Sequence, residues 1–131
     1  MSEQGFDLAR FWLEGGAVMY PILLLGLVAE TVAVVALLTR SSGVALAALA
    51  LAALPLCLGV VGRAQGRRGT DQALAMVSPE HQEAIRAAGY AESERPLQLG
   101  GVLTLLTLPT AAAGFAVSRR RPGAAPVKRL D

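Results

Sequence analysis

The chain of 131 residues has few of the side chains from which catalytic and metal sites are commonly built. It holds one cysteine, Cys57, and one histidine, His81. A single cysteine excludes an intrachain disulfide, and its apolar surroundings indicate a small buried hydrophobe. One cysteine and one histidine cannot supply the usual nitrogen and sulfur ligands of a zinc site. The sequence also offers no phosphate-binding loop and no nucleophile set, so we predict no metal, no cofactor and no enzymatic activity.

Charged residues are also scarce, at 17% of the chain, and 12 basic residues against 10 acidic ones leave a net charge of +2. That excess is too small to indicate a nucleic-acid partner. Hydrophobic residues make up 53% of the chain, and they form long runs instead of the periodic pattern of a soluble domain. We therefore predict an all-α integral membrane protein, with the lipid bilayer as a partner.

Three apolar runs are long enough to cross the hydrocarbon core of a membrane. The first run has about 22 residues, or about 33 Å as a helix. Because a short connection separates the first two runs, they are expected to form a tight helical hairpin. We predict one membrane domain over residues 1–131, with an amphipathic interfacial segment at 1–16, spans at 17–38, 43–62 and 96–118, and a basic tail at 119–131.

The polar segment 63–95 lies between the second and third spans, and its charges balance. We predict a solvated connector that contains two short helices. Thr70 is placed to cap the first helix. Ser78 and Pro79 form a favourable start for the second, and Gly89 is a natural stop for it.

Glu30 is the only ionisable residue in the first span, and it lies about 3 Å from the midpoint. A charge at that depth costs about 2.5 kcal/mol or more, and no Lys or Arg within any span can pair with it. Three states are open: a protonated acid, a hydrogen bond to a hydroxyl on a neighbouring helix or subunit, or exposure to a water-filled cavity. Thr104 and Thr107 on the third span have a suitable depth to bond it.

Small residues recur at helical spacing on the third span, at Gly100, Thr104, Thr107, Ala111, Gly114 and Ser118. Their spacings of 4, 3, 4, 3 and 4 put them on one face of a helix. Gly26 and Ala33 share the face of Glu30 on the first span. We predict a helix-packing face of Gly26, Ala33, Gly100, Ala111 and Gly114. The alternative is that the threonines form the wall of a polar path.

The stretch GGAVMYPILLL at residues 15–25 resembles the start of the first transmembrane helix in the MotA/TolQ/ExbB group of proton-channel proteins, which often reads GGxxMYPILL. Residues 110–117 are similar to the threonine, alanine and glycine pattern of that group's later helices, and residues 88–93 resemble its short relatives. The group has a substantial cytoplasmic helical domain after its first span, whereas this chain has a short connection, and the resemblance does not extend to Glu30.

This resemblance implies a helical oligomer in the bacterial inner membrane that surrounds a partner's helix and couples proton flow to motion. It also implies an N-terminus outside the cell, whereas the Lys and Arg counts on the two sides are equal and do not decide.

Two functions are therefore open. The first is a subunit that packs helix against helix in a larger membrane complex, either as a homo-oligomer or with another membrane protein, with Glu30 as a polar link. The alternative is a proton-conducting, motor-type channel subunit with Glu30, Thr104 and Thr107 on the ion path.

Overall fold

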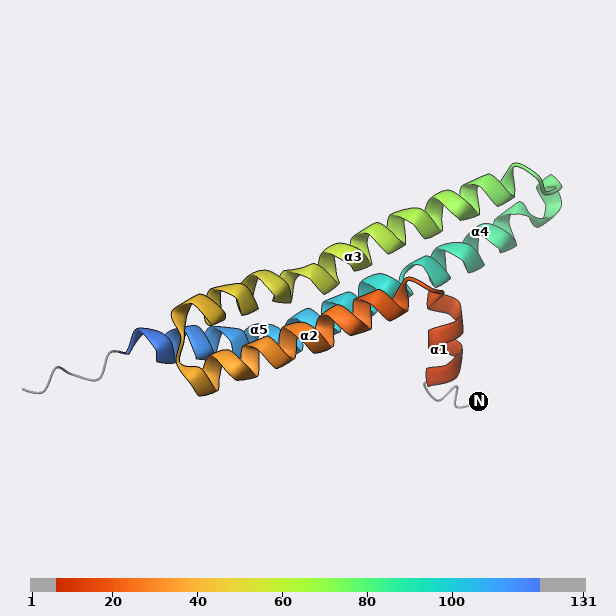
Figure 1. The fold of residues 1–131 in the computed structure, drawn as a ribbon. Coiled ribbons are helices and arrows are strands. Elements are labelled where there is room, and N and C mark those ends of the chain that lie inside the picture. The colour runs from red at the N-terminus through yellow and green to blue at the C-terminus, as the bar shows by residue number, and fades with distance from the viewer. Residues whose placement is uncertain (1–6, 121–131) are drawn as a thin grey trace, which may run out of the picture.

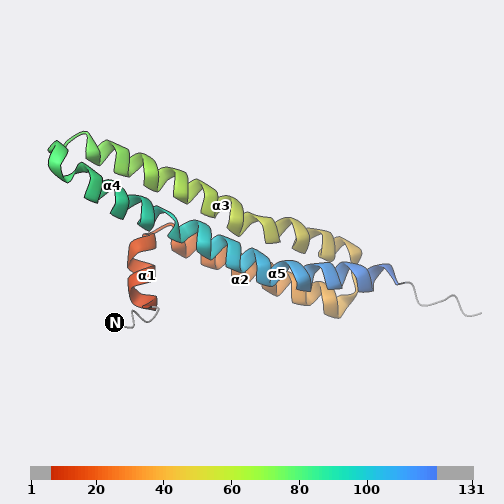
Figure 2. The same ribbon diagram turned by 180° about the vertical axis from the view of Figure 1, so that it is seen from behind.

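The computed structural model describes residues 7–120, and that part of the chain is helical and contains no strand. Three long helices lie side by side in an elongated bundle, and a short helix leaves it sideways (Figures 1 and 2). The helices are α1 (Leu8–Gly15), α2 (Met19–Thr39), α3 (Ser42–Leu74), α4 (Pro79–Ser93) and α5 (Arg95–Arg119).

The predicted all-helical fold is confirmed, and three segments are long and apolar enough to cross a membrane. The first part of the predicted interfacial segment, residues 1–6, and most of the predicted basic tail, residues 121–131, lie outside the described residues.

Local sequence sets most helix boundaries. The carboxylate of Asp7 accepts hydrogen bonds from the first backbone N–H groups of α1, and the Ser41 hydroxyl accepts one at the start of α3. Arg40 ends α2 in the left-handed conformation, with φ of 53°. Pro79 occupies the first turn of α4, where its missing N–H costs little.

The interior of the bundle is built from small residues. Buried positions on α2 and α3 recur at spacings of 3, 4, 3, 4 and 3, the 3.5-residue period of left-handed coiled coils. They are Met19, Ile22, Gly26, Ala29, Ala33 and Ala36 on α2, and Ala45, Ala48, Ala52, Pro55, Gly59 and Gly62 on α3. Because nine of these twelve are glycine or alanine, the helix backbones approach closely.

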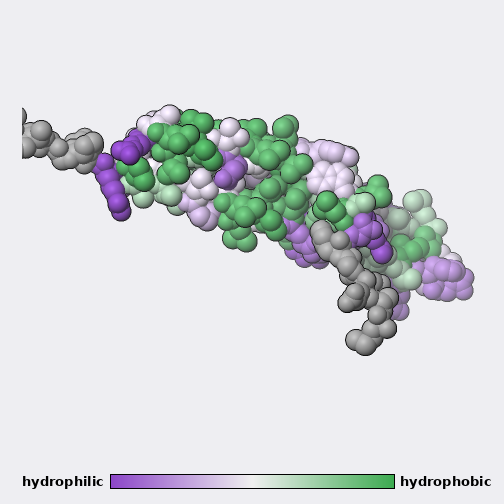
Figure 3. Space-filling view, turned by 90° about the horizontal axis from the view of Figure 1, so that it is seen from below, coloured by the Kyte–Doolittle hydropathy of each residue, from purple (hydrophilic) through white to green (hydrophobic). Residues whose placement is uncertain are grey.

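Large apolar side chains are exposed on the outside of the same bundle, and Figure 3 shows one face on which they gather. Leu24, Leu38 and Leu105 are 62%, 76% and 72% exposed. A protein folding in water would bury leucines in preference to alanines, whereas lipid removes that preference and favours close packing of small residues. Cys57 also lies on this outer surface, so the prediction that it is buried in the fold is wrong.

The polar segment after the second apolar run differs from the prediction. α3 continues without a break from Arg63 to Leu74, and α4 packs back along it as a projecting hairpin (Figure 1). Thr70 is not a cap, because its hydroxyl donates to the Gly66 carbonyl within α3 at 3.0 Å. Gly89 does not end α4; it lies against Thr70, where a Cβ atom would collide. Packing between the helices thus outweighs the low helix propensity of glycine.

Candidate functional site

Glu30 forms a polar pair with α5 near the middle of the bundle. It lies about 16 Å along α2 from Met19 and about 14 Å from Thr39. The Thr110 hydroxyl donates to Glu30 Oε1 at 3.2 Å. The second oxygen, Oε2, is buried and has no hydrogen-bond partner among residues 7–120. The pair is therefore only half satisfied.

Thr110 takes the place predicted for Thr104 or Thr107, and the structure corrects that prediction. Thr104 donates instead to the Ala52 carbonyl on α3, at 2.8 Å. Thr107 is 2% exposed and lies in the interior. α5 packs against both α2 and α3, so its small-residue face turns into the space between them. Thr110 lies at the edge of that face, beside Glu30.

The register of α2 against α5 accounts for this pairing. A Cβ atom added to Gly26 would meet the Leu103 side chain, so these two residues lie at the same level of the bundle. Glu30 follows Gly26 by one helical turn, and Thr110 follows Leu103 by two turns. Because α2 and α5 run in parallel and the glutamate side chain is long, Glu30 can reach Thr110, which lies one turn beyond Thr107.

The five residues of the predicted packing face, Gly26, Ala33, Gly100, Ala111 and Gly114, are all buried in the structure. Ala33 and Ala111 form a core cluster with Ala48 of α3. A Cβ atom at Gly100 would run into the Pro55 carbonyl on α3. A Cβ atom at Gly114 would lie 3.2 Å from the backbone nitrogen of Leu37 on α2. The structure thus places these small residues where the three helices approach most closely.

A second polar group, which the sequence did not predict, lies where the bundle meets the hairpin. Glu94, between α4 and α5, contacts both Arg63 and Arg67 of α3, each at 2.8 Å. The two arginines approach the same carboxylate oxygen from successive turns of α3. This contact joins the hairpin to the end of the apolar bundle.

The next residue, Arg95, holds α1 in the same region. Its guanidinium donates two hydrogen bonds to Glu14 Oε2, at 3.0 and 2.9 Å. Arg10 contacts the other oxygen of Glu14 at 2.6 Å. Hydrogen bonds from Arg10, and then from Arg95, hold the pKa of the Glu14 carboxyl below its usual value. Glu14 and Arg95 are 81 positions apart, so no local pattern could have paired them.

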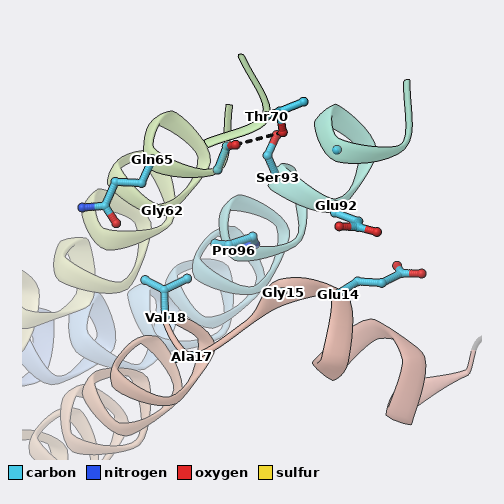
Figure 4. A pocket seen from close by; sticks show the side chains of 12 residues that line it. Glu14, Gly15, Ala17, Val18, Gly62, Gln65, Thr70, Glu92, Ser93 and Pro96 are labelled. Carbon is cyan, nitrogen blue, oxygen red and sulfur yellow. Dashed lines mark hydrogen bonds between the residues drawn. The ribbon is translucent and has the colours of Figure 1, made fainter. Parts of the chain in front are cut away.

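A pocket of about 280 Å³ adjoins this charged group, between the corner of α1 and α2 and the two helices of the hairpin (Figure 4). Glycines and alanine form much of its wall, and Glu14 and Glu92 lie at one side. Within the described part of the chain, no three acidic, histidine or cysteine side chains are grouped to hold a metal ion.

Comparison of the chain with known protein families, with curated proteins and with solved structures finds no match.

Proposed function

We propose that the chain is a three-span membrane protein that acts as a subunit, packing helix against helix in a larger membrane complex. The observation that supports this function is the position of the Glu30–Thr110 pair. Both residues are partly exposed on the outer surface of the bundle, at a depth that corresponds to the middle of a bilayer. Polar residues inside membranes almost always face a protein interior or water instead of lipid. A further helix over this pair would remove it from lipid.

The adjacent outward face of α5 suits such a helix. In its first half this face carries large exposed residues, Leu105 and Leu106 among them. Beyond them the exposed residues become small: Pro109, Ala112, Ala113 and Ala116. Ala113 lies one turn from Thr110 and on the same side of α5. Small side chains allow another backbone to approach closely, and interhelical hydrogen bonds in membranes contribute about 0.6 kcal/mol on average.

The test compares the replacement of two exposed alanines by phenylalanine. Ala113→Phe puts a large ring beside the Glu30–Thr110 pair, and the control Ala50→Phe makes the same change on the exposed surface of α3. We expect cross-linking in native membranes and native mass spectrometry to show a complex for wild type and for Ala50→Phe. Ala113→Phe should lose it. A wild-type protein that is monomeric in both measurements would contradict the proposal.

The second candidate is a proton-conducting, motor-type channel subunit of the MotA/TolQ/ExbB kind, favoured by the unpartnered Oε2 of Glu30. In that case Glu30 carries the proton, Thr104 and Thr107 line the path, and the location is the bacterial inner membrane. Its test is proton flux into vesicles that contain the chain alone or with its membrane partners. Flux that is lost in Glu30→Gln supports this candidate; flux that is absent throughout, or unchanged by Glu30→Gln, excludes it.

A further inference from the structure

α1 leaves the bundle at a sharp corner. Gly16, between α1 and α2, has φ of +67°, a conformation that favours glycine. The corner turns α1 across the direction of the bundle, at the level where the apolar helices meet the hairpin (Figures 1 and 2). If the bundle stands upright in a bilayer, a helix in this direction runs along the membrane surface.

The polar side of α1 faces the hairpin end of the molecule. Arg10 and Glu14 are one turn apart on that side, and Glu14 is bound by Arg95 at the start of α5. Glu14 also lines the pocket that Glu92 of α4 borders. The charges of α1 thus join the polar group at the end of the bundle.

The apolar side of α1 faces the opposite way. Trp12 is about 200° around the helix from Glu14, and its ring meets the Tyr20 ring edge-on at 5.4 Å, on the first turn of α2. Leu8, one turn before Trp12 and on the same side, is 66% exposed. This side is continuous with the exposed apolar surface of α2. α1 therefore has its polar side toward the polar hairpin and its apolar side toward the apolar bundle.

We propose that α1 lies in the plane of the bilayer surface, with Leu8 and Trp12 against the acyl chains and with the Glu14–Arg95 ion pair at the headgroups. The occupant of its apolar face is lipid, and the proposal rests on the membrane insertion that is part of the proposed function. In-plane helices bury their apolar face about 5–10 Å into the boundary between headgroups and acyl chains. Aromatic residues such as Trp12 and Tyr20 favour that level.

This arrangement fixes the depth of the whole molecule. The charges of Arg63, Arg67 and Glu94 stand at or above the membrane surface, and the hairpin projects into water on the side of α1. Glu30 lies about 16 Å along α2 from Met19, the first residue of the helix after the corner. This distance places its carboxyl deep in the hydrocarbon core.

Trp12 is the only tryptophan of the chain, so its fluorescence reports on α1 without any substitution. The experiment uses the full chain in phosphatidylcholine vesicles whose acyl chains carry bromine at a shallow or a deep position. We expect strong quenching by the shallow bromine, weaker quenching by the deep one, and little by aqueous acrylamide. Strong quenching by acrylamide without lipid quenching would overturn the proposal, and so would strongest quenching by the deep bromine.

Two substitutions at exposed apolar residues refine the test. Leu8 on α1 and Met76 at the hairpin tip are 66% and 84% exposed. We expect Leu8→Gln to lose most of the shallow quenching of Trp12 and Met76→Gln to leave it unchanged; equal effects would contradict lipid contact by α1. Alkaline carbonate separates the two proposals: extraction of the whole protein contradicts membrane insertion itself, whereas a retained protein with a water-exposed Trp12 overturns only the placement of α1.

Discussion

In both the apolar bundle and the projecting hairpin, glycines let neighbouring helices pack closely. The two regions differ in the residues on their outer surfaces. In the bundle, Gly100 lies against the α3 backbone at Pro55, and in the hairpin Gly89 lies against Thr70. The bundle covers this contact with exposed leucines and valines. The hairpin covers it with charges, and it adds a hydrogen bond from Tyr90 to Asp71 at 2.8 Å.

The difference teaches that small residues bring helices together in both regions, while the outer residues are largely apolar on the bundle and largely polar on the hairpin. In lipid, close packing and a few hydrogen bonds hold helices together. In water, ion pairs at an exposed surface add little, so the packing of α3 against α4 contributes more to the hairpin than its ion pairs do. Arg63 and Arg67 lie at the change from one surface to the other, within a single continuous helix.

The largest expected effect is in the bundle. Gly100→Leu puts a side chain into the α3 backbone, which cannot move aside, and we expect a loss of about 3 kcal/mol in the free energy of unfolding. Gly101→Leu is the matched control, because nothing lies within 4 Å of a Cβ atom there. Unfolding in mixed micelles by increasing denaturing detergent measures both. Equal losses for the two neighbouring glycines would contradict the packing described.

The hairpin offers the same comparison with a smaller effect. Gly89→Ala crowds Thr70, and we expect faster hydrogen exchange in α4, equivalent to a loss of about 1–2 kcal/mol. Gly69→Ala faces open space and should slow exchange in the hairpin, because alanine favours helix by up to about 1 kcal/mol over glycine. Two changes of the same sign would show that α3 and α4 do not pack as described.

A substitution at the junction between the two regions should change the stability less than either glycine substitution that adds a clash. Glu94→Gln removes the charge that Arg63 and Arg67 share, and we expect a loss of about 1 kcal/mol in the stability of the hairpin. High salt should weaken the wild-type contact and reduce the difference between the two proteins. Hydrogen exchange of α4 at low and high salt measures the effect. A difference that persists unchanged at high salt would indicate a role for Glu94 other than ion pairing.

The smallest effect is the dependence of α1 on pH. Because the pKa of Glu14 is lowered from 4.5 in the folded chain, its ion pairs stabilise α1 fully above pH 4.5. That stabilisation is lost as the pH falls through the lowered pKa. We expect Trp12 fluorescence in detergent to change in this acid range for wild type and for Glu92→Gln, and not for Glu14→Gln. A transition that survives in Glu14→Gln would assign it to another group.

Composition and run length were sufficient to predict the helical fold and three helices long and apolar enough to span a membrane, because a span requires a minimum length and hydrophobicity. The predicted spans 17–38 and 96–118 agree with α2 and α5 to within two residues at each end. The second span was predicted to end at Gly62, where hydropathy ends, whereas the α3 helix ends at Leu74. Hydropathy shows which part of a helix is apolar, and it does not show where the helix ends.

The candidate site was predicted only in part. Glu30 is conspicuous in sequence because its charge interrupts an apolar run, and the small faces follow from spacing. The choice of Thr110 over Thr107 depends on the rotation of α5 between two neighbours, which a single helix does not encode. The pairing of Glu14 with Arg95 likewise needs the corner at Gly16, which places α1 beside the start of α5.

The most direct test of the central claim, that the leucine-covered surface of the bundle faces lipid, uses the single cysteine. Cys57 is exposed on α3, about 9 Å along the helix from Arg63. The comparison is Met76→Cys in a Cys57→Ser chain, at the exposed hairpin tip. In opened membrane vesicles treated with a water-soluble maleimide, we expect Met76→Cys to be labelled rapidly and Cys57 only after detergent is added. Labelling of Cys57 in the membrane as fast as that of Met76→Cys would contradict the claim.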